Sequence, residues 1–108
     1  MEMHNPPHPG QLINDIYLAP YSLSVEELAD KLGLNVERIA SVIAQNAGID
    51  AALAIRLEAV LGGSARSWMG MQSSYDISVA RKGIDLSGLA KMSFPELGEV
   101  PNPDKYYA

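Results

Sequence analysis

The sequence contains no cysteine, so it can form neither a disulfide framework nor a thiolate metal site. It also lacks any apolar run that approaches the roughly 20 residues needed to span a bilayer. The opening stretch, MEMHNPPHPG, has neither the basic region nor the apolar region of a secretory signal. We therefore expect a protein that acts in the cytoplasm without contacting a membrane.

Basic residues are scarce, above all in the first part of the chain. The net charge is −5, and residues 1–62 contain three basic residues (Lys31, Arg38 and Arg56) against eight acidic ones. Residues 63–108 contain five of each sign. Because phosphate neutralisation supplies most of the non-specific affinity for DNA, this distribution argues against strong DNA binding by a single copy of the first part.

Patterns typical of catalysis and of metal binding are also missing. There is no Ser/His/Asp arrangement, no HExxH motif and no glycine-rich phosphate loop, since Gly62-Gly63 follows a helical pattern instead of preceding one. His4 and His8 lie in a proline-rich stretch with no carboxylate at ligand spacing. We expect no enzyme activity, no catalytic residues, no metal, no cofactor and no small-molecule substrate.

What is present is the composition of one small folded domain. The 108 residues are 47% hydrophobic and 19% charged, which is typical of a globular protein. Residues 1–8 are expected to form an irregular arm, residues 9–82 a helical domain, and residues 83–108 a C-terminal extension. Within this extension a short amphipathic segment, Asp85 to Met92, predicts a sixth helix, and the chain from Ser93 onwards predicts an extended tail.

Start and stop signals divide the helical domain into five helices. Pro9 suits the first position of a helix that runs to about Leu18, and Pro20 is expected to end it. Ser24 and Glu27 form a capping box, and Gly33 stops that second helix after about nine residues. Further caps are predicted at Asn35, Asp50 and Ser64. The fold class is thus all-α, and the second and third helices form a helix-turn-helix pattern.

Apolar side chains at three- and four-residue spacing predict the core faces of these helices. Trp68 is expected to be a core anchor whose indole N–H needs a partner. Arg56 is expected to pair with a neighbouring carboxylate, and Tyr75-Asp76 to lock the fifth helix against the core or, alternatively, to lie in a dimer interface. The predicted core faces consist of Leu12, Ile13, Ile16, Tyr17, Val25, Leu28, Ala29, Leu32, Val36, Ile39, Val42, Ile43, Leu53, Ala54, Leu57, Val60, Leu61, Trp68, Met71, Gln72, Tyr75 and Val79.

Several motifs together resemble a known family. They include His8-Pro9-Gly10, Pro20, Ser24 with Glu27-Leu28-Ala29, Leu32-Gly33-Leu34, Ile39, Ala54-Ile55-Arg56-Leu57, Gly62 with Ser64, Trp68, and Gln72 followed by Tyr75-Asp76-Ile77. The match runs without gaps from His8 to about Ala80. The chain resembles HigA-type antitoxins, the plasmid-maintenance antidote or virulence-associated protein I group of the Xre-like, lambda-repressor-like helix-turn-helix proteins.

The resemblance implies a function. Members of this group are non-enzymatic five-helix proteins, usually homodimers, that repress their own operon at a palindromic operator. They neutralise a small co-encoded toxin that cleaves mRNA on the ribosome. A toxin partner of this chain is expected to be basic, because the first part of the chain is acidic.

Candidate DNA-contacting residues lie around the predicted third helix. Arginine can pair bidentately with guanine, Asn and Gln with adenine, and Glu can accept from cytosine, while a helix N-terminus can hold a phosphate. The third helix would enter the major groove. The candidates are Ser24, Asn35, Glu37, Arg38, Ser41, Gln45 and Asn46.

The same stretch departs from the family, and this leaves an alternative open. Ala40, Ala44 and Ala47 stand where family members commonly have polar or basic residues or an Asn-Gly turn, and Asp50 and Ala52 replace a Thr and an acidic residue. Arg38 is therefore either a DNA reader or a surface charge paired locally with Glu37 or Ser41. The alternative function is a helix-turn-helix scaffold that has lost DNA reading and acts as a protein–protein interaction module.

Overall fold

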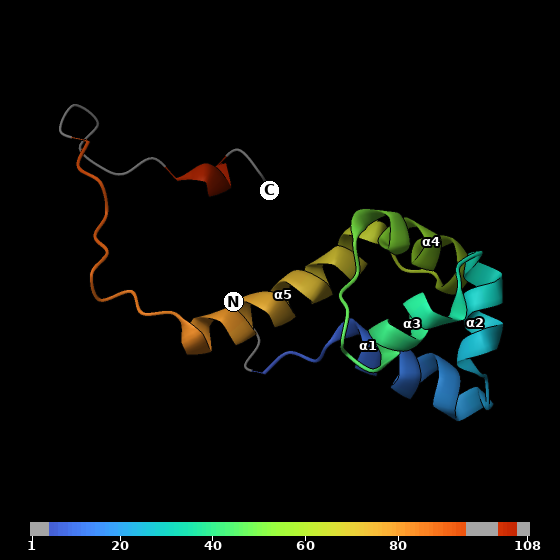
Figure 1. Ribbon diagram of the computed structural model, residues 1–108. Coiled ribbons are helices and arrows are strands. Elements are labelled where there is room, and N and C mark those ends of the chain that lie inside the picture. Colours follow the sequence, from blue (N-terminus) through green and yellow to red (C-terminus); the bar gives the residue numbers. More distant parts are fainter. Residues whose placement is uncertain (1–4, 95–101, 106–108) are drawn as a thin grey trace.

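The computed structural model describes residues 5–94 and 102–105, and it is helical throughout its regular structure. The all-α prediction is confirmed in this described part. Five helices form the domain, with α1, α2, α3 and α4 gathered at one end and α5 extending away from them (Figure 1). Their bounds are α1 Pro9–Leu12 continued by η1 Ile13–Leu18 and η2 Ala19–Tyr21, then α2 Val25–Leu32, α3 Val36–Ile43, α4 Ala51–Leu61 and α5 Ala65–Gly83.

The first helix changes its hydrogen-bond spacing and does not end at Pro20. Residues Ile13–Leu18 form a π-helical turn, after which the backbone N–H of Ala19 donates to the carbonyl of Asn14. Pro20 then lies inside a 3-10 turn, Ala19–Tyr21, at a position where its missing N–H removes no hydrogen bond. The run ends at Ser22, whose φ of 53° is left-handed. The prediction that Pro20 terminates the helix was wrong by one short turn.

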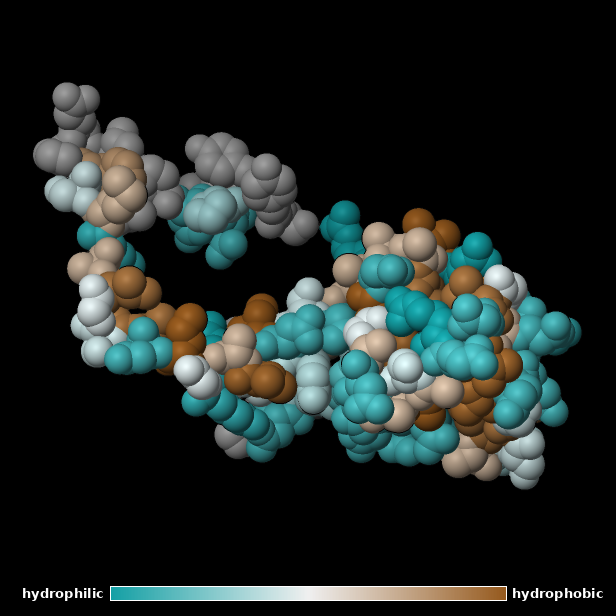
Figure 2. Space-filling view, in the orientation of Figure 1, coloured by the Kyte–Doolittle hydropathy of each residue, from teal (hydrophilic) through white to brown (hydrophobic). Residues whose placement is uncertain are grey.

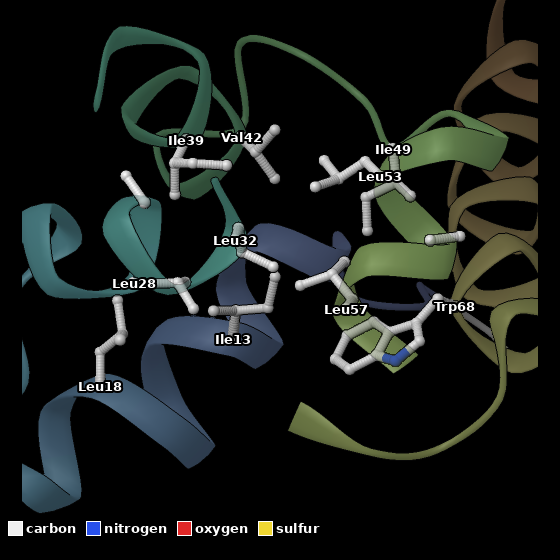
Figure 3. Close-up of a cluster of buried hydrophobic side chains, with 12 residues drawn as sticks. Ile13, Leu18, Leu28, Leu32, Ile39, Val42, Ile49, Leu53, Leu57 and Trp68 are labelled. Carbon is white, nitrogen blue, oxygen red and sulfur yellow. The ribbon is translucent and has the colours of Figure 1, made fainter. Parts of the chain in front are cut away.

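All five helices contribute to one apolar core. Side chains from α2, α3 and α4 converge on Ile13 and Leu18 of the first helix and on Trp68 of α5 (Figure 3). Ile39 and Val42 are buried as predicted, and Ile43 is partly buried. Full members of the core are Ile13, Leu18, Leu28, Ala29, Leu32, Ile39, Val42, Ile49, Leu53, Ala54, Leu57 and Trp68.

Four predicted core residues are exposed, Ile16 of the first helix and three valines. Val36 lies in the first turn of α3, Val60 in the last turn of α4, and Val79 near the end of α5. Each valine has the correct helical period but lies toward an end of its helix, where no neighbouring element covers it. The core-face prediction was wrong at these positions because periodicity gives the direction of a side chain but not the length of the packed surface.

Two side chains join one helix to the C-terminal end of another through a backbone carbonyl. Arg56 Nη1 donates to the carbonyl of Leu32 at 2.6 Å, at the C-terminus of α2. The expected carboxylate partner of Arg56 is thus replaced by a helix end, whose partial negative charge favours a cation. Trp68 Nε1 donates to the carbonyl of Gly62 at 2.9 Å, so this core anchor does satisfy its indole N–H.

The chain beyond α5 runs away from the helical domain (Figure 1). Within residues 84–94 there is no helix, so the predicted helix from Asp85 to Met92 was wrong; Asp85 Oδ1 instead accepts from the backbone N–H of Ser87 in a turn. A short helix that packs against nothing is not stable by itself, and Gly88 lowers its propensity further. A 3-10 turn, η3 Pro103–Lys105, occurs in the predicted tail, whose residues 95–101 and 106–108 lie outside the described residues, as do residues 1–4 of the arm with His4.

Apolar side chains remain exposed along this part of the chain. They gather over the outer half of α5 and the segment that follows it (Figure 2). In the described residues, no helix combines the length and the apolar character that membrane crossing requires. The large apolar residues exposed here are Ile77, Val79, Ile84, Leu86, Leu89 and Met92.

Candidate nucleic-acid interface

The helix-turn-helix is built by local caps, as the sequence predicts. Ser24 Oγ accepts from the backbone N–H of Glu27 at 3.0 Å, and the Glu27 carboxylate accepts from the N–H of Ser24, so the capping box is closed. Gly33 ends α2 with a φ of 71°. Asn35 Oδ1 then accepts from the N–H of Arg38 at 2.8 Å and starts α3. These three devices set the angle at which α3 leaves α2.

Packing against α1 fixes the other end of α3. Gly10 lies so close to the last turn of α3 that a Cβ at this position would be 1.8 Å from the carbonyl oxygen of Val42. His8 begins α1, because its Nδ1 accepts from the N–H of Gly10 at 2.9 Å, and Pro9 occupies the first helical position. The His8-Pro9-Gly10 motif therefore brings two helix backbones into contact.

The outward face of α3 is open to solvent. Asn35, Glu37 and Ala40 are exposed, and Arg38 and Ser41 are half-exposed. The opposite face packs Ile39 and Val42 into the core. This arrangement presents the polar side chains along the outer surface of one helix, which is the geometry required for entry into a groove.

Gln45 and Asn46 continue this face beyond the end of α3. Gln45 has a φ of 65°, a left-handed conformation that turns the chain after Ala44. The backbone N–H groups of Asn46 and Ala47 both donate to the carbonyl of Ser41, at 2.9 and 3.2 Å. The side chains of Gln45 and Asn46 are exposed. Six of the seven predicted residues thus share α3 and the turn that follows it, whereas Ser24 stands at the start of α2.

Three side chains from different elements lie against the loop between α3 and α4. Gln72 Oε1 on α5 accepts from the N–H of Ile49 at 2.8 Å. Arg38 Nη1 on α3 donates to the carbonyl of Gly48 at 3.2 Å. His8, at the start of α1, lies beside the backbone of Ala47. We call residues 45–49 the α3–α4 loop. Its backbone is hydrogen-bonded by a side chain of α3 and by a side chain of α5.

Arg38 is paired differently from the prediction. Its Nη2 lies 3.5 Å from Oδ2 of Asp50, and its Nη1 binds Gly48. The expected local partners, Glu37 and Ser41, are not used. Helix periodicity could not reveal this contact, because Asp50 lies beyond the turn that ends α3.

His8 and Gln72 are contributors that sequence reasoning did not include in the site. His8 is buried and meets the ring of Tyr75 edge-on, with 4.8 Å between the ring centroids. Burial lowers the pKa of His8, while Asp76 and the backbone of Ala47 act in the opposite direction. Gln72 Nε2 donates to Asp76 Oδ1 at 2.9 Å. Tyr75 thus joins α5 to His8 of the arm, while Asp76 binds Gln72, the residue of α5 that holds the α3–α4 loop.

These side chains border a shallow polar depression of about 260 Å³ between the α3–α4 loop and α5. Asp76 is the single carboxylate in its lining, which also contains His8, Gln72 and Tyr75. Among the residues that the structure describes, no group of three or more His, Cys, Asp or Glu side chains is placed to hold a metal ion.

Known proteins share both the sequence and the architecture of this chain, although no family model matches it. Virulence-associated protein I of Dichelobacter nodosus is 39% identical over 75 residues, which is 69% of each chain. The Pseudomonas aeruginosa protein PA4674, solved in complex with its operator DNA, is 31% identical, with a TM-score of 0.71 over 74% of this chain and 84% of that one.

A second solved structure that resembles this chain is that of an antitoxin. The Pseudomonas aeruginosa antitoxin HigA, solved with the higBA promoter, is 30% identical, with a TM-score of 0.72 over 80% of this chain and 96% of that one. The helix-turn-helix, its caps and the α3–α4 loop all lie between His8 and Ala80, the stretch in which the sequence resembles the family. The chain belongs to the helix-turn-helix family of HigA-type antitoxins and virulence-associated protein I.

Proposed function

We propose that this protein is a sequence-specific DNA-binding regulator that acts as a homodimer on a palindromic operator upstream of its own gene in the cytoplasm. The observation that carries this proposal is the outward face of α3 with the turn after it. This face is supported from behind by α1 and α2, its following loop is bound by Gln72 of α5, and no residue that the structure describes covers it. Relatives solved with operator or promoter DNA support it.

Each candidate residue has a chemical role in this proposal. Arg38 pairs with guanine, Gln45 and Asn46 with adenine, and Glu37 accepts from cytosine N4. Ser41 donates to a base edge or a phosphate. Asn35 uses Oδ1 for the helix cap and keeps its amide N–H₂ for DNA. At the N-terminus of α2, the backbone around Ser24 faces a phosphate.

Selection of genomic fragments by the purified protein tests this function. We expect enrichment of a palindrome upstream of its own gene, with half-sites about one helical turn, or a multiple of it, apart. Binding should weaken steeply as salt rises. Enrichment of no sequence, or of unrelated fragments in proportion to their abundance, would contradict the proposal.

The dimer is supported by the unpartnered apolar surface of α5 and the following segment. Ile77, Ile84, Leu86 and Leu89 are all exposed, and a second copy would remove them from water. Light scattering coupled to size exclusion is expected to give twice the monomer mass. A monomer at operator-binding concentrations would remove the two-fold symmetry on which a palindromic site depends.

Neutralisation of a co-encoded toxin is the second half of the proposed role. It is supported by membership of the antitoxin family and by the acidic charge of residues 1–62, which suits a basic partner. The protein itself acts by binding and not by catalysis. If a small basic protein is encoded next to this one, its expression alone should arrest growth. Co-expression of the present protein should restore growth and yield a stable complex of the two, and a neighbour that stays toxic and unbound would refute this part.

A protein-interaction module without DNA reading is the alternative, favoured by one observation. Arg38 is the single basic residue between Asn35 and Asn46, and its guanidinium is paired with Asp50. If this alternative holds, the double variant R38A/Q45A keeps full partner binding and no operator is found. Loss of operator affinity in the same variant would instead support DNA reading.

A further inference from the structure

Both terminal nitrogens of the Arg38 guanidinium are already engaged within the protein. Nη1 donates to the carbonyl of Gly48 at 3.2 Å, and Nη2 lies 3.5 Å from Asp50 Oδ2. A guanidinium recognises guanine through two parallel hydrogen bonds from one edge. In the free protein that edge points toward the α3–α4 loop and Asp50.

The two carboxylate oxygens of Asp50 have separate roles. Oδ1 accepts from the backbone N–H of Leu53 at 2.8 Å and caps α4. Oδ2 faces Arg38. The Asp50 side chain is 69% exposed and that of Arg38 31% exposed, so DNA can reach the pair without disturbing the core. Exposed ion pairs are weak, and this one is therefore exchangeable.

We infer that Asp50 is an affinity-determining residue that competes with DNA for the guanidinium of Arg38. The inference rests on the proposed DNA-binding function and adds to it a residue, Asp50, that contacts Arg38 and not the DNA. Binding exchanges the Asp50 carboxylate for the acceptor atoms of guanine, so part of the favourable contact with DNA is offset by the contact that is lost. Removal of the Asp50 charge should release Arg38 and strengthen binding.

The variant Asp50→Asn separates the two roles of this side chain. Asparagine caps a helix N-terminus as well as aspartate does, so α4 keeps its cap while Arg38 loses its charged partner. The probes are a duplex from the region upstream of the protein's own coding sequence and a scrambled duplex of equal length. Fluorescence anisotropy should show binding about two- to fivefold tighter per subunit for D50N, which is the range of an exposed ion pair.

A double-mutant cycle distinguishes release of Arg38 from a general gain in charge. D50N is measured in the wild-type and R38Q backgrounds, and the gain should disappear in R38Q. Asp30→Asn on α2 is the matched control, because it removes an exposed carboxylate that makes no ion pair with any residue the structure describes. The effect of D30N on the affinity for DNA should be the same with and without Arg38. Thermal unfolding verifies that D50N folds as the wild type does.

The outcomes separate the inference from the function that underlies it. Specific binding of the upstream duplex with no gain for D50N, or with an equal gain in R38Q, overturns the inference alone. If neither wild type nor D50N distinguishes the upstream duplex from the scrambled one, the proposed function fails and the inference falls with it. Specific binding with a gain that requires Arg38 supports both.

Discussion

The amide oxygen of Gln72 on α5 accepts a hydrogen bond of 2.8 Å from the backbone N–H of Ile49, just before α4. The side chain of Gln72 is buried, and its Nε2 donates to Asp76. Gly48, next to Ile49, accepts from Arg38 on α3. A continuous set of contacts thus runs from α5 through the α3–α4 loop to the helix that is proposed to read DNA.

Replacing Gln72 by Met should destabilise the protein. Methionine fills a similar volume but leaves the N–H of Ile49 without its acceptor. A buried donor left unsatisfied costs about 1–3 kcal/mol, and chemical denaturation should show that loss in the free energy of unfolding. The neighbouring exposed residue provides the control, because Ser73→Ala should change the stability by no more than about 0.5 kcal/mol. Equal stabilities for Q72M and S73A would refute this account of Gln72.

Gly10→Ala should separate α1 from α3. The added Cβ would lie 1.8 Å from the Val42 carbonyl oxygen, which belongs to a helix backbone that cannot rotate away. Overpacking of this kind costs about 1–3 kcal/mol or more. The matched control is Gly70→Ala, whose Cβ would meet nothing within 4 Å inside α5. Alanine at that helix position should stabilise by about 0.5–1 kcal/mol, so thermal melting should move the two variants in opposite directions.

The stability of the protein should fall in mild acid because of His8. Burial holds the pKa of His8 below its ordinary value of 6.5, so the unfolded chain binds a proton more readily than the folded one. The stabilisation is complete above pH 6.5 and is lost as the pH falls toward the folded-state pKa, at up to about 1.4 kcal/mol per pH unit. A proton on Nδ1 would also remove the acceptor for the N–H of Gly10.

The variant His8→Asn isolates this effect from that of the carboxylates. Asparagine keeps a cap acceptor for α1 but does not titrate. Denaturation curves are compared at about pH 7.5 and about pH 5.5, which lie within the range over which histidine titrates. The loss of stability between the two should be smaller for H8N than for wild type. Identical losses would mean that His8 does not carry the pH dependence.

Gln45→Ala should relax specificity at one base pair of each half-site. Gln45 is exposed in the turn after α3, so its removal leaves the fold intact. A lost bidentate contact costs about 1–3 kcal/mol of discrimination against the wrong base. Gln11→Ala is the control, because Gln11 is exposed on α1 and lies outside the proposed face. Titration of operators varied one position at a time should show a flattened preference for Q45A only.

The local architecture of the site could be predicted from the sequence, whereas its long-range partners could not. Ser24 with Glu27, Gly33 and Asn35 act within three or four residues, and such caps leave a signature in the chain. Ile39 and Val42 follow helical period. Arg38 and Arg56, in contrast, bind groups that lie 10 and 24 residues away, and no local pattern specifies which of several carbonyls or carboxylates they reach.

Two errors came from treating a segment apart from its surroundings. The first helix passes through a π-helical turn at Ile13–Leu18 and is followed by a 3-10 turn that contains Pro20, although proline usually ends a helix. The segment from Asp85 to Met92 has an amphipathic pattern but no surface to pack against, and it stays irregular in the described residues. In both cases tertiary context, and not propensity, decides the backbone.

The central claim is that the outward face of α3 and the turn after it read DNA although they carry only one positive charge, that of Arg38. The most direct measurement is the ratio of the affinities of the wild-type protein for its upstream palindrome and for a scrambled duplex, at moderate salt. We predict a preference of about a thousandfold or more, as is typical of specific operator binding. Equal affinities for the two duplexes at all salt concentrations would contradict the claim.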